Sequence, residues 1–284
     1  MPLVSGTDVL KPARRDGYAV PAFSIHTPEM VDAVFAAAEH LRSPLLLQVG
    51  RRTVRQSGVE EACAWVRQRA ARSPVPAALH LDHSQDIVAV LQGLRAGCTS
   101  VMYDGSDLPF AENVRRTREV VAACHAVGVP VEAEVGRVSG VEDDLSVDEA
   151  ESRLATPDGC RQFVEATECD TLAPAVGSVH GLGSGPAHLH IDLIRAIGEA
   201  IPHPLVLHGG SGLDPEQLRA AIAAGISKVN LDTELRRLFG RELQAALAVY
   251  VPQDDPRPAL IQAEQALTAA AEDRIRQLGS EGRA

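Results

Sequence analysis

Three histidines of this chain stand directly after apolar stretches of sequence. His83 and the neighbouring Asp82 follow VPAALHL, His180 follows TLAPAVGSV, and His208 follows PLVL. Three histidines are a known catalytic zinc set, which leaves one coordination position open for substrate. A single histidine at such a place is more often a hydrogen-bonded structural residue. The three together, with an aspartate beside one of them, predict a catalytic zinc centre.

Other polar residues occupy the ends of further apolar runs. Asp104 follows SVMY, Glu134 lies inside VPVEAEV, and Asn230 and Asp232 lie in SKVNLD. Burying a carboxylate without a partner is costly, so Glu134 indicates a specific interaction. His26 also ends an apolar run and is a candidate fourth metal ligand. All these positions are far apart in sequence, so a shared site requires a fold that gathers the run ends.

A glycine-rich turn, GGSG at residues 209–212, follows His208 and precedes the expected helix start at Asp214. Glycines let the backbone approach an anion closely, and the N–H groups at a helix start favour negative charge. In barrel enzymes phosphate commonly binds after the seventh strand. We therefore interpret the turn as a phosphate or anion site, with a simple tight turn as the alternative.

Eight short apolar segments alternate with longer amphipathic stretches. The expected strands cover residues 18–25, 44–50, 75–82, 99–106, 129–136, 171–178, 204–211 and 227–234. They are continuously apolar, which is typical of strands covered on both faces. Such alternation favours a parallel sheet closed into a (β/α)8 TIM barrel, in which the carboxyl ends of the strands carry the chemistry. An open doubly wound sheet is the alternative fold.

Other features of the chain set its organisation. Thr27, Thr156 and Asp214 each precede a proline and are expected to begin helices. The acidic segment 137–155 is expected to be irregular and to form a mobile active-site loop, with a disordered surface insertion as the alternative. An additional C-terminal helix is expected over 257–278. We expect a single domain over residues 1–284.

Composition limits the classes of partner. The formal net charge is −11 and no basic block occurs, so a nucleic-acid partner is not expected. No apolar run is long enough to cross a membrane, so no membrane-spanning segment is expected. The five cysteines show no C-x-x-C pair, which favours reduced thiols and a cytoplasmic location.

The sequence resembles the class II fructose-bisphosphate and tagatose-bisphosphate aldolases. The motifs HLDH, SVHG and LHGGSG carry the resemblance, and they occur in the order of that family. AFSIHTPEMVDAVF, VEAEVGRVSGVED and ISKVNLDTEL are also similar. The similarity extends from about residue 17 to residue 240. In combination these motifs are specific, and the family has the TIM-barrel fold predicted above.

The resemblance implies a mechanism. Zinc on His83, His180 and His208 would bind the oxygens of dihydroxyacetone phosphate and stabilise the enediolate formed when the carbon–carbon bond breaks. Asp82 would move the proton on the C4 oxygen of the ketose. Glu142, in the 137–155 loop, matches the family's mobile acid, which exchanges the proton on the enediolate carbon.

The resemblance also implies roles for the remaining polar residues. Asn230 and Asp232 would position the three-carbon ketone. Asp104 and Glu134 match a second site, for a divalent or monovalent cation. The residues that match phosphate contacts of the family are Gly181, Gly209, Gly210, Ser211 and Thr233.

The chain departs from the family pattern at four positions. They are Ser24 in place of Asn, Gly50 in place of Ser, Val141 in place of an acidic residue, and Ser184 in place of Lys. Loss of the lysine removes a charge-assisted contact worth roughly 1.5–3 kcal/mol. Two interpretations stay open: Arg51, Arg52 or Arg137 supplies the missing charge, or the substrate is a different sugar phosphate.

The expected protein is therefore a carbon–carbon lyase. It would cleave a ketose 1,6-bisphosphate of the fructose or tagatose type, reversibly, to dihydroxyacetone phosphate and an aldehyde such as glyceraldehyde 3-phosphate. The first alternative is the same enediolate chemistry on another sugar phosphate or sugar acid. The others are a TIM-barrel metallohydrolase, which would need H-x-H where this chain has only His26, and a non-catalytic binding protein. A homodimer or homotetramer is expected.

Overall fold

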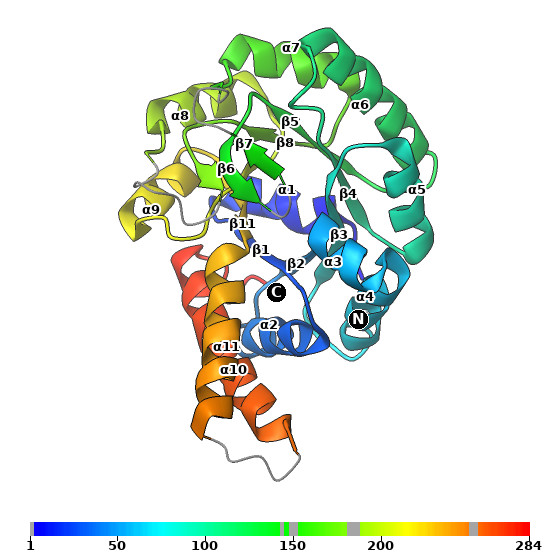
Figure 1. Ribbon diagram of the computed structural model, residues 1–284. Helices are drawn as coiled ribbons and strands as arrows, with labels where there is room; N and C mark the ends of the chain where they lie inside the picture. The colour runs from blue at the N-terminus through cyan, green and yellow to red at the C-terminus, as the bar shows by residue number, and fades with distance from the viewer. Residues whose placement is uncertain (1–2, 143–144, 148–152, 181–187, 250–254) are drawn as a thin grey trace.

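Eight parallel strands close into a barrel in the computed structural model of the protein, and helices surround them (Figure 1). The strands follow one another around the barrel in the order β1-β11-β10-β8-β5-β4-β3-β2. The predicted (β/α)8 barrel is confirmed, and the open doubly wound sheet was wrong because the first and last strands pair. The structure describes residues 3–142, 145–147, 153–180, 188–249 and 255–284, with the backbone alone for 139–142, 145–147 and 180.

The barrel strands are short and entirely buried. They are β1 (Val20–Ser24), β2 (Leu45–Val49), β3 (Ala77–Ser84), β4 (Ser100–Tyr103), β5 (Val131–Val135), β8 (Thr171–Pro174), β10 (Leu205–Leu207) and β11 (Ile226–Leu231). Side chains alternate between the two faces of a strand, so every second residue points into the barrel. The other face packs against the surrounding helices, which explains the continuously apolar runs.

Helices precede, connect and follow the barrel strands. They are α1 (Gly6–Asp16), α2 (Pro28–Leu41), α3 (Arg51–Ser57), α4 (Val59–Ala70), α5 (Ile87–Ala96), α6 (Phe110–His125), α7 (Pro157–Thr167), α8 (Ile191–Ala200), α9 (Pro215–Ala223), α10 (Thr233–Val249) and α11 (Arg257–Gln277). The helix starts expected at Thr27, Thr156 and Asp214 are confirmed. Each of these side chains accepts a hydrogen bond from a backbone N–H of the first turn.

Helix α1 closes the amino-terminal end of the barrel. Its residues Val9, Leu10 and Ala13 pack against Val20 of β1 and Leu46 of β2 in one buried apolar cluster. The sequence analysis placed no helix here. This end of the barrel is therefore filled with apolar side chains.

The segment expected to be an irregular loop contains regular structure. Strands β6 (Ser139–Glu142) and β7 (Leu145–Val147) form an antiparallel hairpin, and β6 also pairs in parallel with β9 (Val179–His180). Arg137 and Arg153 form a bridge at the base of this hairpin. The expectation of an irregular segment was therefore wrong for these residues. In Figure 1 the hairpin lies over the strands of the barrel.

The last two helices extend beyond the barrel. Helices α10 and α11 lie side by side and project away from the strands, in orange and red in Figure 1. Helix α11 also packs against α2, and its bounds agree with the helix expected over 257–278. None of the helices within the described residues is long and apolar enough to span a membrane.

Candidate active site and metal centre

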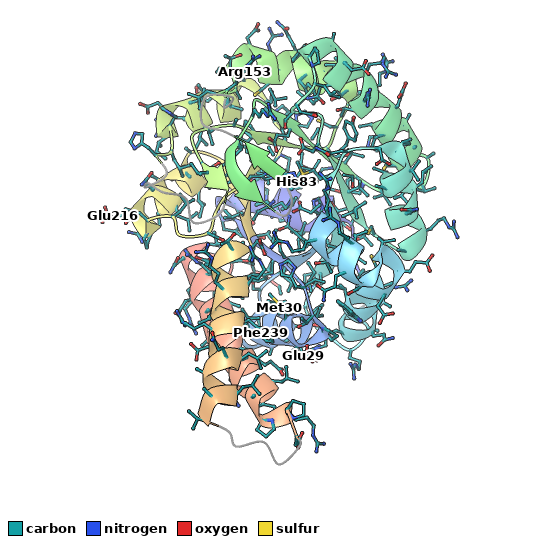
Figure 2. All side chains as sticks on the ribbon, viewed as in Figure 1. Glu29, Met30, His83, Arg153, Glu216 and Phe239 are labelled. Carbon is teal, nitrogen blue, oxygen red and sulfur yellow. The ribbon has the colours of Figure 1, made fainter. Side chains whose placement is uncertain are left out.

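The predicted site residues gather at the carboxyl-terminal mouth of the barrel. Asp82 and His83 end β3, Asp104 follows β4, Glu134 lies near the end of β5, and His208 follows β10. Asn230 and Asp232 occupy the end of β11 and the residue after it. In Figure 2 His83 is labelled near the middle of the barrel. The barrel thus brings together residues that are up to 150 positions apart.

His83 has an unusual backbone conformation that aims its side chain. Its φ is 48°, in the left-handed region, and the pairing of β3 with β4 shifts register between Leu81 and Ser84. A bulge of this kind turns a side chain that would otherwise point away from the barrel axis. His83 Nδ1 lies 2.9 Å from Asp104 Oδ2. Because a carboxylate only accepts, Nδ1–H donates to Asp104 and fixes the ring.

His208 lies between two carboxylates of β5. Its Nε2 is 3.1 Å from Glu132 Oε1, and its Nδ1 is 3.2 Å from Glu134 Oε2. The rings of His208 and His83 meet edge to face, with centroids 4.8 Å apart. His83, Glu134 and His208 each offer a ligand atom, and these atoms lie within 4.8 Å of one another. The three residues form the candidate metal centre.

The donor set fits a divalent cation. A metal-binding histidine usually donates its other ring N–H to a carboxylate, which orients the ring and raises its basicity. Here His83 does so to Asp104, and Glu132 receives Nε2–H of His208. Burial alone would lower the pKa of His83, yet Asp82, Asp104 and Glu134 raise it to about 10. The cluster therefore favours positive charge strongly.

The third expected histidine cannot be placed in the same detail. His180 lies in β9, whose backbone pairs with β6, and its side chain is outside the described residues. The side chain of Glu142, at the end of β6, is likewise outside them. Gly181 and Ser184 lie wholly outside the described part of the chain. The predicted roles of these four residues stay predictions.

Sequence reasoning missed a buried polar layer below the metal centre. Lys228 of β11 is fully buried, with Nζ 2.6 Å from Glu132 Oε2 and 3.3 Å from His80 Nε2. Burial alone would raise the pKa of Glu132, but Lys228 and the hydrogen bond from His208 lower it to about 2. The ammonium and the carboxylate thus stabilise each other, and Glu132 links Lys228 to His208.

Asp82 is held by this same layer. Gln48 Nε2 donates to Asp82 Oδ1 at 2.8 Å, and His80 Nε2 lies 3.6 Å from the same oxygen. Among the described residues these contacts engage Oδ1, so Oδ2 is the oxygen that can exchange a proton with a ligand. Burial alone would raise the pKa of Asp82, but His83, His80 and Lys228 lower it below its ordinary value. Asp82 is therefore ionised, and Gln48 holds one of its two oxygens.

His26 was a candidate fourth metal ligand, but its ring nitrogens contact other residues. Its Nε2 lies 2.7 Å from Asp232 Oδ1 and its Nδ1 lies 3.0 Å from Thr53 Oγ1. With both ring nitrogens engaged in this way, His26 does not join the cluster of His83, Glu134 and His208. Burial alone would raise the pKa of Asp232, but the bond from His26 and the nearby Arg236 lower it. His26 fixes Asp232 at the mouth.

The predicted ketone and phosphate contacts surround the start of α10. Asn230 is 2% exposed, and among the described residues neither its amide oxygen nor its nitrogen has a hydrogen-bond partner. The Ser211 hydroxyl accepts weakly from the backbone of Asp232 and Glu234 at 3.3 and 3.4 Å. Thr233 is the first residue of the helix. An unpaired buried amide is costly, which makes Asn230 a candidate for contact with a ligand.

The two glycines after His208 have structural reasons of their own. A Cβ on Gly209, whose φ is 68°, would come within 2.4 Å of the Val179 carbonyl oxygen. A Cβ on Gly210 would meet Val229 at the same distance, and the Gly210 N–H donates to the Asn230 carbonyl. The Gly210 amide is therefore already engaged, and close packing of the turn explains both glycines without a ligand.

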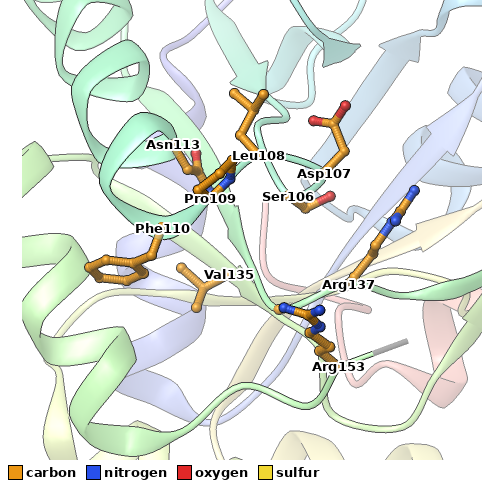
Figure 3. Close-up of a pocket in the computed structure, with 10 residues that line it drawn as sticks. Ser106, Asp107, Leu108, Pro109, Phe110, Asn113, Val135, Arg137 and Arg153 are labelled. Carbon is orange, nitrogen blue, oxygen red and sulfur yellow. The ribbon is translucent and has the colours of Figure 1, made fainter. Parts of the chain in front are cut away.

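Two cavities open near the mouth. One of about 250 Å³ is lined by Asp82 and His83 together with residues of α3, α4 and α5. The other, of about 570 Å³, lies farther out between the β4–α6 loop and the end of β5 (Figure 3). Arg137 and Arg153 border the larger cavity, but none of the three cluster residues lines it. The smaller cavity is thus the one that shares residues with the candidate metal centre.

Comparison with known proteins agrees with this geometry. The model of the family described as fructose-bisphosphate aldolase, class II, matches residues 4–283. The chain belongs to the class II fructose-bisphosphate aldolase family. Members of this family are metal-dependent lyases, and the cluster of His83, Glu134 and His208 is where this chain could hold a metal.

Solved structures of similar proteins support the assignment to the family. The YdjI aldolase of Escherichia coli K12 is 29% identical, with a TM-score of 0.89, and each chain covers 99% of the other. A putative fructose-1,6-bisphosphate aldolase of Coccidioides immitis is 31% identical with a TM-score of 0.90, over 98% of this chain and 97% of that one. The fructose-bisphosphate aldolase of Campylobacter jejuni, at 20% identity, shares the fold with a TM-score of 0.84 over 100% and 97% of the two chains.

Proposed function

We propose that this family member is a zinc-dependent aldolase that cleaves a ketose 1,6-bisphosphate of the fructose or tagatose type. The products would be dihydroxyacetone phosphate and an aldehyde such as glyceraldehyde 3-phosphate. The observation that carries the proposal is the pairing of both cluster histidines with carboxylates, directly beside Asp82. That arrangement combines a cation site with a proton-transfer group.

Zinc would be held by His83, His208 and, from outside the described side chains, His180. When bound, it would supply Lewis-acid catalysis to the oxygens of the ketone half. Asp104 and Glu132 hold the two described rings in place. Asp104 and Glu134 were also expected to form a second cation site. Asp104 accepts from Nδ1–H of His83, so we propose that it orients that ring. Glu134 Oε2 lies 3.2 Å from His208 Nδ1, the nitrogen left for the metal when Nε2–H donates to Glu132, so Glu134 would offer a further ligand to the same cation. A second cation on Asp104 and Glu134 stays a prediction.

The ketone half would lie between the cluster and the start of α10. Asn230 would hydrogen-bond its hydroxyl or carbonyl oxygens, because the amide has no described partner in the protein. Asp232, fixed by His26, would accept from a substrate hydroxyl. We propose that the phosphate lies at the N-terminus of α10, against Ser211 and Thr233, where the helix dipole favours an anion. Gly181 and Gly209 complete this proposed phosphate site.

Asp82 would move the proton on the C4 oxygen during cleavage. Its Oδ1 is fixed by Gln48, so Oδ2 would accept the hydroxyl proton while the carbon–carbon bond breaks, and would return it to the aldehyde oxygen in the reverse direction. We propose that Glu142 exchanges the proton on the enediolate carbon of the three-carbon product.

A single assay series tests the proposal. Purified protein would be analysed for bound zinc and then incubated with dihydroxyacetone phosphate in deuterium oxide. Proton magnetic resonance should show exchange at the carbinol carbon, and a chelator should abolish the exchange. Zinc bound without exchange would contradict the proposed chemistry. No bound metal under zinc-replete conditions would contradict the proposed metal centre.

The same chemistry on another sugar phosphate or sugar acid is the second candidate. It is favoured by Gly50, which has no hydroxyl for a distal phosphate. A metallohydrolase has less support, since His26 contacts Asp232 and Thr53 rather than the cluster. A homodimer or homotetramer and a cytoplasmic location stay predictions.

A further inference from the structure

We propose that the 250 Å³ cavity beside Asp82 holds the aldehyde half of the substrate and that Arg51 binds a terminal anionic group of that half. The cavity lies between β3 and the helices α3, α4 and α5. This inference rests on the proposed aldolase function, because it concerns the same bond. It adds the chemical class of the aldehyde: a short hydroxylated chain that ends in phosphate or carboxylate.

The cavity lies next to the candidate metal centre, as Asp82 and His83 show. Both residues line it, and His83 is also a member of the candidate metal centre. A substrate whose ketone half lies at that centre places its C4 oxygen at Asp82. The atoms beyond C4 must then continue past Asp82, and the cavity is the space on that side. The larger cavity of Figure 3 shares neither residue, so it cannot take these atoms directly.

A buried hydroxyl inside the cavity indicates a ligand. Ser84 is 4% exposed and lines the cavity next to His83. Among the described residues its Oγ has no hydrogen-bond partner. A buried polar atom of this kind destabilises the protein unless a ligand or water pairs with it. A hydroxyl of the aldehyde chain would pair with Ser84 directly beyond the bond that is cleaved.

Arg51 gives the outer end of the cavity its positive charge. The side chain is half-buried at the start of α3, and its Nη1 donates to Gln85 Oε1 at 2.8 Å. A guanidinium carries five N–H donors, so this bond leaves donors for an anion, with the planar fork that suits phosphate and carboxylate. The hydrogen bond to Gln85 orients the guanidinium group of Arg51. Arg55 of α3 also lines the cavity and adds to the positive potential.

One oxygen of each acidic group that lines the cavity is already engaged. Asp82 Oδ1 accepts from Gln48, and Asp86 Oδ1 accepts from the backbone N–H of Ala89 at the start of α5. The volume corresponds to roughly eight water-sized groups at about 30 Å³ each. A three- or four-carbon aldehyde with one anionic group is of this size, whereas a second sugar ring is not.

The test compares aldehydes of different charge in the aldol addition direction. Dihydroxyacetone phosphate would be combined with glyceraldehyde 3-phosphate, with succinic semialdehyde, and with uncharged glyceraldehyde. Arg51→Met should lower the ratio of kcat/KM for the charged aldehydes to that for glyceraldehyde by about 10- to 100-fold, the value of a charge-assisted hydrogen bond. Arg51→Lys should recover part of the loss. Arg52→Met is the matched control, since Arg52 is the next residue of α3 and does not line the cavity.

The outcomes separate this inference from the proposed function. A loss of selectivity for glyceraldehyde 3-phosphate alone identifies phosphate as the terminal group, and a loss for succinic semialdehyde alone identifies carboxylate. Unchanged ratios in Arg51→Met, or equal losses in Arg52→Met, would overturn the role of Arg51. Exchange of dihydroxyacetone phosphate with deuterium oxide needs no aldehyde. Its absence in the unmodified protein would overturn the proposed function instead.

Discussion

The metal side of the site and the aldehyde side meet at Asp82, and they differ in how the protein holds them. On the metal side, His208, Glu132 and Lys228 form a buried chain of contacts no longer than 3.1 Å. On the aldehyde side, Arg51 is half-buried and bonds to Gln85, which is itself partly exposed. One side is an interlocked set of charges, and the other is a short helix carrying long side chains.

The two sides differ in how much a single substitution costs. Removing one partner of a buried ion pair leaves an uncompensated charge and costs about 3–5 kcal/mol. Exchanging a half-exposed arginine costs far less, since water replaces its contacts. Under the proposed function, we therefore expect the metal side to depend on a buried ion pair that cannot be broken without loss of stability. We expect the choice of aldehyde to depend on residues of α3 that can be exchanged at little cost.

The largest effect is expected on the metal side, from His208→Ala. The variant should lose zinc affinity and deuterium exchange by more than about 100-fold, which is the effect of losing even an outer partner of a ligand. Metal analysis and the exchange assay measure the two losses. His190→Ala is the control, because His190 is exposed at the start of α8. Undiminished zinc in His208→Ala would contradict the proposed metal centre.

The next largest effect tests the residue at which the two sides meet. Asp82→Asn should retain zinc and lose cleavage by about 10²- to 10⁴-fold, because an amide cannot accept the proton of the C4 hydroxyl. Steady-state cleavage and metal content are measured together. Asp192→Asn, at an exposed position of α8, should change neither. If Asp82→Asn lost its zinc, Asp82 would belong to the metal centre rather than to proton transfer.

The fold could be predicted from the sequence because most barrel strands are short, mainly apolar runs followed by a helix signal. Helix α1 was missed because Pro12 lies inside it and the segment carries several charges. The spacing of Val9, Leu10 and Ala13 is the signal that could have located it. Helix α3 was missed because its sequence, RRTVRQS, has only one apolar residue.

The candidate site could be predicted in part, for a physical reason. Strand-end residues share one mouth in any barrel, so Asp82, Asp104 and Glu134 could be grouped without a structure. The polar layer beneath them was missed, although alternation along the strands could have located it. Glu132 lies two residues before Glu134, and Lys228 two residues before Asn230, so both point into the barrel. A lone lysine in an apolar strand is easily taken for an edge residue.

That buried layer gives the largest expected change in stability. Lys228→Met should lower the free energy of unfolding by about 3–5 kcal/mol, because Glu132 loses its counter-charge in the barrel interior. Denaturant unfolding measures the change. Lys11→Met is the matched control, at an exposed position of α1, and should stay within about 0.5 kcal/mol of the unmodified protein. Equal stabilities of the two variants would show that the buried pair contributes nothing.

The smallest expected effect contrasts two buried asparagines. Asn113 donates to the Glu134 carbonyl and accepts from Thr117, whereas the Asn230 amide has no described partner. Asn113→Leu should therefore destabilise the protein by about 1–3 kcal/mol, and Asn230→Leu should leave stability unchanged or raise it. Only Asn230→Leu should weaken the binding of dihydroxyacetone phosphate, which would be measured as a raised KM in the exchange assay. If Asn230→Leu destabilised the protein as much as Asn113→Leu, the amide would be a structural group, and the ketone half would need another anchor on β11.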